Sequence, residues 1–155
     1  MTPFPPLVID TNIHDLIQKT FDVDLPISGA WGYTQKEASI IESLPSSMTR
    51  PQLQHMITSM RSHLEMNITQ VKAHRYGGIN ANEKAREVIK SDTSIFDKVT
   101  YEVSAIKEDI YHAFIKEYKM GYETEMFDIS NHFKRRKEAT LIREVIHYFE
   151  VSSIK

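Results

Sequence analysis

Apolar residues recur at steps of three and four after Pro51, the spacing that places them on one face of an α-helix. Proline is favoured at the first helical position, and Gly77 and Gly78 stop the pattern. The pattern therefore predicts the longest helix of the chain, near residues 51–75. Its apolar face comprises Leu53, Met56, Ile57, Met60, Leu64, Ile68 and Val71.

Shorter segments show helical spacing as well. Apolar residues from Ile13 to Phe21 follow a capping Asp or Thr, and those from Ile110 to Tyr118 lead to a terminating glycine. A charged helix is expected over residues 130–138.

Two intervening segments have weaker patterns. Asn80 and Glu83 resemble a helix start followed by apolar residues, so we expect a helix there. Residues 37–42 are ambiguous, because Thr34 with the glutamate three positions later forms a capping-box pattern, whereas Pro45 limits the length of a helix.

Alternation of apolar and polar residues marks the clearest strand, residues 98–107. Residues 140–151 are rich in β-branched and aromatic residues, which favours a second strand, with a helix as the alternative. We expect the two strands to be antiparallel neighbours. Because helices and strands do not alternate regularly, the sequence predicts an α+β fold, with this small antiparallel sheet packed against three to four helices.

The N-terminal third differs from the rest of the chain. All six prolines lie there, and residues 22–33, which also contain Gly29 and Gly32, are expected to be irregular or an edge strand. The length of 155 residues suits one domain. We therefore expect a single globular domain over residues 1–155, with an irregular, proline-containing N-terminal third.

Composition excludes several classes of protein. The chain has no cysteine, which removes disulfide scaffolds, thiolate metal sites and cysteine nucleophiles. The net charge is −2 and the pI is about 6.4, below the value above ~9 that is typical of a dedicated nucleic-acid-binding domain. No apolar run approaches a membrane span, and the first ten residues carry no Lys or Arg, so we expect a soluble cytoplasmic protein with no membrane partner.

Marked catalytic motifs are absent. The five glycines form neither a dinucleotide-binding nor a P-loop pattern, and no two of the seven histidines are three or four residues apart. The remaining acid–base candidates are Asp109, His112, Glu117 and His147. The alternative interpretation is that the acids stabilise a helix start and His147 is a hydrogen-bonded sheet residue. We expect no metal and no cofactor.

Two segments are candidates for recognition. Trp31 and Tyr33 lie in a glycine-flanked aromatic segment, which is typical of interface anchors, although we favour a loop in which Trp31 fills the core. A run of four cations could contact phosphates, or could form a solvated face that pairs with acidic segments. The run comprises Lys134, Arg135, Arg136 and Lys137.

The leading hypothesis is a small non-catalytic interaction protein, such as an inhibitor, an immunity or antitoxin-like partner, or an accessory factor. It would bind another protein or self-associate. The alternative is a small hydrolytic or metal-assisted enzyme that uses the carboxylate and histidine candidates. A third hypothesis is a nucleic-acid-binding accessory protein that uses the basic run.

Overall fold

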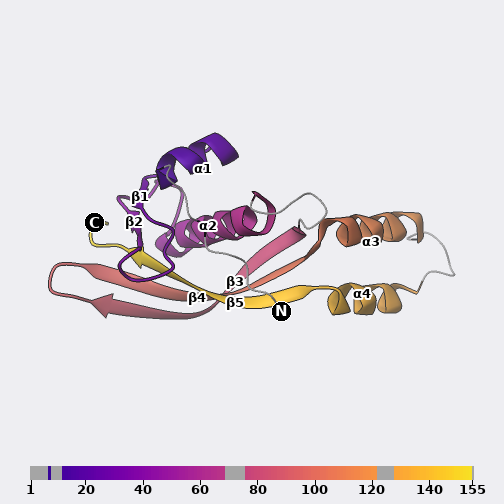
Figure 1. Cartoon of the computed structure of the whole chain (residues 1–155). Helices are drawn as coiled ribbons and strands as arrows, with labels where there is room; N and C mark the ends of the chain where they lie inside the picture. The colour runs from indigo at the N-terminus through magenta and orange to yellow at the C-terminus, as the bar shows by residue number, and fades with distance from the viewer. Residues whose placement is uncertain (1–6, 8–11, 69–75, 122–127, 155) are drawn as a thin grey trace.

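The computed structural model describes residues 7, 12–68, 76–121 and 128–154 of the chain (Figure 1). Its helices are α1 (Ile13–Phe21), α2 (Arg50–His63), which continues as the π-helical turn η1 (Leu64–Ile68), α3 (Glu108–Gly121) and α4 (Ile129–Glu138). Its strands are β1 (Ile27–Gly29), β2 (Ser39–Ile41), β3 (Tyr76–Lys90), β4 (Ile95–Lys107) and β5 (Leu141–Glu150).

The five strands form one mixed sheet in the order β1-β2-β5-β4-β3. The β2–β5 pair is parallel and the other pairs are antiparallel. The predicted antiparallel pairing of residues 98–107 with residues 140–151 is confirmed, and Thr100 lies opposite Ile146. The α+β fold class is likewise confirmed.

Helix α2 begins as the sequence predicts. Pro51 occupies the first turn, and Thr49 and Gln52 form a reciprocal capping box that satisfies two backbone N–H groups. The helix becomes a π-helical turn at Leu64. The last part of the predicted helix, residues 69–75, lies outside the described residues, as do residues 1–6 and 8–11 of the N-terminal third.

The core lies between α2 and one face of the sheet. Figure 1 shows α1 and α2 on the same side of the long strands. On α2, Leu53 and Ile57 are completely buried, and they belong to the same apolar cluster as Val99, Tyr101 and Val103 of β4. Burial of apolar side chains from both layers is the main source of stability in such a two-layer domain.

Two segments differ from their sequence pattern. The helix expected to start at Asn80 is wrong, because these residues form the edge strand β3 and pair with β4. The hydrogen-bond ladder to β4 outweighs the weak capping signal, since local propensity yields to tertiary pairing. The ambiguous segment at residues 37–42 contains the short strand β2, whose Ile41 is completely buried.

Helices α3 and α4 form a pair that we call the helical arm. Strand β4 leads directly into α3, and α4 leads back into β5, so the arm continues past one end of the sheet (Figure 1). Helix α3 has no buried residue, and α4 buries only His132. The arm therefore contributes almost nothing to the hydrophobic core. Among the described helices, none has the length and apolar character needed to cross a membrane.

Candidate functional site

The aromatic segment predicted as a recognition candidate is tied to the core. Trp31 is only 6 % exposed and belongs to the main apolar cluster. Gly32 has a φ of +79°, and a Cβ there would lie 2.1 Å from the His147 ring, so glycine is required. The Tyr33 hydroxyl accepts from the Leu7 N–H at 3.0 Å and donates to Glu65. The structure thus places Trp31 in the interior, as the core-filling interpretation expects.

A buried arginine holds this segment in place. Arg61 of α2 donates to the carbonyl oxygens of Trp31 at 3.1 Å and Ile146 at 3.0 Å, and its guanidinium lies 4.5 Å from the Tyr33 ring centroid. Burial lowers the pKa of Arg61, while the neighbouring Glu65 carboxylate opposes that shift. Burial, reinforced by Glu65, raises the pKa of Tyr33, so its phenol stays protonated and keeps donating.

His147 is also part of the interior. Its Nε2 lies 2.9 Å from the Ser39 hydroxyl, which donates to the Ala30 carbonyl, and its Nδ1 lies 2.9 Å from the Thr58 hydroxyl. The network assigns the proton to Nε2, with Nδ1 accepting from Thr58. Burial, and secondarily Arg61, lowers the pKa of His147 well below its ordinary value. Both ring nitrogens are therefore occupied in a fully buried, neutral imidazole.

The structure does not bring the four acid–base candidates together. His147 is in the core, whereas Asp109 accepts from the Ile110 N–H at the start of α3. Glu117 binds Arg135 and His132 between the arm helices, and these contacts, Arg135 first, lower its pKa. Of the four, His112 lines a cavity. The described residues contain no group of three or more His, Asp or Glu that could hold a metal ion.

A buried carboxylate escaped the sequence analysis. Asp97 of β4 has no exposed surface, and it accepts from the Gln54 amide at 2.8 Å. Arg50 and Arg86 lie 3.1 and 3.4 Å from the same carboxylate. This ion pair ties the start of α2 to the β3–β4 ribbon. All three contacts reach the Oδ2 atom of a completely buried side chain, so we assign the carboxylate a structural role.

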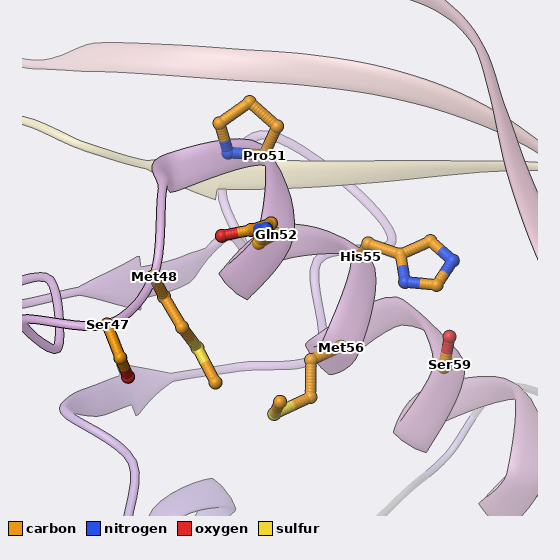
Figure 2. Close-up of a pocket in the computed structure, with 7 residues that line it drawn as sticks. All are labelled: Ser47, Met48, Pro51, Gln52, His55, Met56 and Ser59. Carbon is orange, nitrogen blue, oxygen red and sulfur yellow. The ribbon is translucent and has the colours of Figure 1, made fainter.

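A cavity of about 700 Å³ lies beside the first half of α2. In Figure 2, Met48 and Met56 extend toward the same side, while the His55 ring points away from them. The His55 Nε2 is 2.7 Å from the Ala81 carbonyl oxygen. The cavity is lined by Ser47, Met48, Pro51, Gln52, His55, Met56 and Ser59, and it contains no carboxylate and no Lys or Arg.

A second cavity, of about 400 Å³, lies where η1, β3 and α3 meet. It brings His63 beside His112 and Glu108, and the side chain of Asn67 lies within 3.4 Å of the His63 ring. Asn67 also accepts from the Tyr76 N–H at 2.9 Å. These contacts link the end of the helical layer to the beginning of β3.

The basic run divides into two pairs. Arg135 binds Glu117 and lies 5.7 Å from the Phe114 ring, and Arg136 lies 5.3 Å from the Tyr111 ring. The arginines therefore hold α4 against α3. Lys134 and Lys137 are exposed, and they make no ion pair within the described part of the chain.

The outer surface of the arm combines apolar and basic side chains. Four large apolar residues are exposed on it, and Met120 is 72 % exposed. A cavity of about 330 Å³ on α3 is lined by His112, Ile115, Lys116, Lys119 and Met120. The two arm helices contain six Lys or Arg and four acidic residues, in a chain whose net charge is −2. The exposed apolar residues are Ile110, Met120, Ile129 and Phe133.

Comparisons with known proteins give no relative to set beside this geometry: no protein-family model, no curated protein and no solved structure matches the chain.

Proposed function

We propose that the chain is a non-catalytic interaction protein whose helical arm binds an acidic, partly apolar surface of another protein. The observation that carries this proposal is that the arm helices leave four large apolar residues exposed instead of packing them into the core of their own chain. Helices of 14 and 10 residues are too short to be stable by propensity alone. A partner that covers them supplies the missing burial.

The side chains of the arm support a protein partner whose surface is acidic and partly apolar. The lining of the cavity on α3 combines the apolar Ile115 and Met120 with Lys116 and Lys119. Such a site suits an apolar side chain that is flanked by carboxylates. Lys134 and Lys137 add positive charge on α4. Exposed apolar side chains favour a protein over a nucleic acid, because nucleic-acid interfaces are more polar and more strongly basic.

A photo-crosslinking experiment tests the proposal. We would place p-benzoylphenylalanine at position 133 in the arm and, as the control, at the exposed position 95 in the β3–β4 ribbon. In cells of the source organism, position 133 is expected to give one protein adduct that position 95 does not give. Mass spectrometry identifies the adduct, and titration calorimetry then measures binding of the purified partner.

A charge reversal distinguishes specific recognition from adhesion. Lys116→Glu with Lys119→Glu is expected to weaken binding of that partner at least tenfold, whereas Lys90→Glu on the edge strand leaves it unchanged. Equal crosslinking at both positions, or a partner whose affinity ignores the charge reversal, overturns the proposal. A nucleic-acid adduct at position 133 in place of a protein also overturns it.

A further inference from the structure

One face of the sheet has no covering layer among the described residues. The residues of β4 and β5 alternate, so one set points toward α2 and the other set points away. In β5, Val145 and Phe149 are 7 % and 0 % exposed, whereas Ile142 and Ile146 are 51 % and 38 % exposed. We call the second side the open face.

The open face consists of five cross-strand rows over β3, β4 and β5. The middle row contains Ala85, Thr100 and Ile146. On one side of it lie Glu87, Lys98 and Tyr148, and the Lys98 Nζ is 5.9 Å from the centroid of the Tyr148 ring. On β4, the five rows contain Phe96, Lys98, Thr100, Glu102 and Ser104. Opposite these on β5, in the same order, are Glu150, Tyr148, Ile146, Glu144 and Ile142.

Two carboxylates face each other in the row on the other side of the centre. Glu102 lies directly opposite Glu144, and like charges at directly opposed positions destabilise a sheet. Lys84 reaches Glu102 at 3.9 Å and compensates in part. The row therefore attracts a further cation.

The open face is self-complementary under a two-fold rotation. An axis that crosses the strands at Thr100 places β4 of one copy antiparallel to β4 of the other. Lys98 then faces Glu102 of the second copy, and Glu102 faces Lys98, because both lie two residues from the axis. The central Ile146 meets its own counterpart. The rotation thus brings a cation to the Glu102–Glu144 row and an apolar contact to the middle.

Edge-to-edge pairing of two sheets is the competing mode of association, and the edge strand β3 is protected against it. Strand β3 is the long edge, opposite the three-residue edge strand β1, and its register shifts between Glu83 and Ala85, which leaves Lys84 as an extra residue. A bulge and charged side chains along an edge discourage pairing with another strand. Association through the open face is therefore favoured over edge-to-edge pairing.

We propose that the chain forms a symmetric dimer in which the open faces of two copies pack together, with Lys98 of each copy paired to Glu102 of the other. Sheets that pack face to face lie about 10 Å apart and align within about 30°. The two-fold axis sends the helical arms to opposite ends of the dimer. This proposal is independent of what the arms bind.

The size of the open face sets the expected affinity. Five rows of three residues are fewer than the roughly 20–30 residues that each partner contributes to a standard interface. We therefore expect a dissociation constant of about 1–100 μM, which corresponds to roughly 5–8 kcal/mol.

Sedimentation of two charge-reversal variants tests the dimer. In Lys98→Glu, the new carboxylate faces Glu102 of the other copy, and in Glu102→Lys, the new amine faces Lys98. Each variant alone is expected to dimerise at least tenfold more weakly than the wild type. A mixture of the two variants restores every opposed pair, so it is expected to form a heterodimer. The double variant Lys98→Glu with Glu102→Lys is expected to regain the homodimer.

Matched controls keep the result interpretable. Lys90→Glu changes the same charge outside the open face and is expected to dimerise like the wild type. Circular dichroism and thermal unfolding confirm that each variant is folded. A wild type that remains monomeric at several hundred micromolar overturns the proposal, as do single variants that dimerise normally or a mixture that stays monomeric. Crosslinking from position 148 to a different protein, with no self-adduct, also overturns it.

Discussion

The two faces of the same sheet carry different kinds of residues. Toward α2, the strands present completely buried residues such as Val99 and Phe149, together with buried polar groups such as His147. Away from α2, the same strands present Ile142 and Ile146 beside charged residues. Strand geometry is common to both faces, so the difference comes entirely from the presence of a covering layer.

The comparison shows where stability and where binding capacity reside. On the covered face, each polar group is enclosed, so a substitution leaves a cavity or an uncompensated group. On the open face, water replaces any group that is removed, and a change there acts on association instead. Four predictions test this division, from the largest expected effect on stability to the smallest.

The largest effect is expected for Phe149→Ala on the covered face. Phe149 is completely buried and stacks on the His147 ring at a centroid distance of 4.0 Å. Its truncation removes buried apolar surface and leaves a cavity, so we expect a loss of ~3–5 kcal/mol in the free energy of unfolding. Urea denaturation below 1 μM protein, where the monomer predominates, measures the loss. A loss under ~1 kcal/mol would contradict the assignment of Phe149 to the core.

A loss of ~1–3 kcal/mol is expected for Asp97→Ala, because the completely buried Gln54 amide loses its acceptor and the part-exposed Arg50 and Arg86 lose one anionic partner. The matched control on the open face is Glu102→Ala. Its ion pair with Lys84 is exposed, so we expect a change below ~1 kcal/mol. Urea denaturation of the two variants in parallel checks the contrast, and equal losses would show that the two faces do not differ in this way.

The buried imidazole predicts a pH dependence of stability. The pKa of His147 is lowered in the folded chain by burial and by Arg61, so below pH 6.5 the unfolded chain binds a proton that the folded chain does not. Its contribution to stability is therefore present above pH 6.5 and is lost as the pH falls. The difference between the wild type and His147→Gln is expected to change by up to ~1.4 kcal/mol per pH unit between pH 6 and 5.

The difference between the two proteins is the informative quantity, because other groups titrate in the same range. His14 is half-buried, and its contacts with Asp24 and Asp15 raise its pKa, which acts in the opposite sense. His14 is present in both proteins, so its effect cancels in the comparison. If the difference in the free energy of unfolding between the wild type and His147→Gln is the same at pH 6 and pH 5, then His147 is charged or exposed in the folded chain.

The smallest effect on stability is expected for Ile146→Thr on the open face. Threonine keeps the β-branched shape that suits a strand, and the side chain is 38 % exposed, so the free energy of unfolding of the monomer changes by less than ~0.5 kcal/mol. Sedimentation is expected to show at least tenfold weaker dimerisation. A stability loss comparable to that of Phe149→Ala would show that the open face is not open in solution.

The aromatic segment and the long helix illustrate how far the pattern alone reaches. The apolar stripe of α2 predicts the helix and its start at Pro51, since spacing and capping are local properties. A second, polar stripe runs beside it at the same spacing, through Gln54, Thr58, Arg61 and Glu65, and all four residues are buried. This stripe was the available signal that α2 is covered on two sides.

Other features of the candidate sites depend on contacts between distant segments. The sequence favours core filling over an interface for Trp31, and the burial of its side chain among residues of distant segments decides for the core. The contact between His132 and Glu117 joins α4 to α3, although no sequence motif links the two residues. The strand at Asn80 is decided by β4, whose hydrogen bonds it shares.

The sequence by itself determined the α+β class and the helix at Pro51, because periodicity and capping residues act over a few neighbouring positions. The tertiary structure decided which side of each strand is covered, which cations of the basic run remain exposed and which histidine is enclosed. These properties depend on which segments meet in space, and alternation along a strand is the same whether a helix or water lies above it.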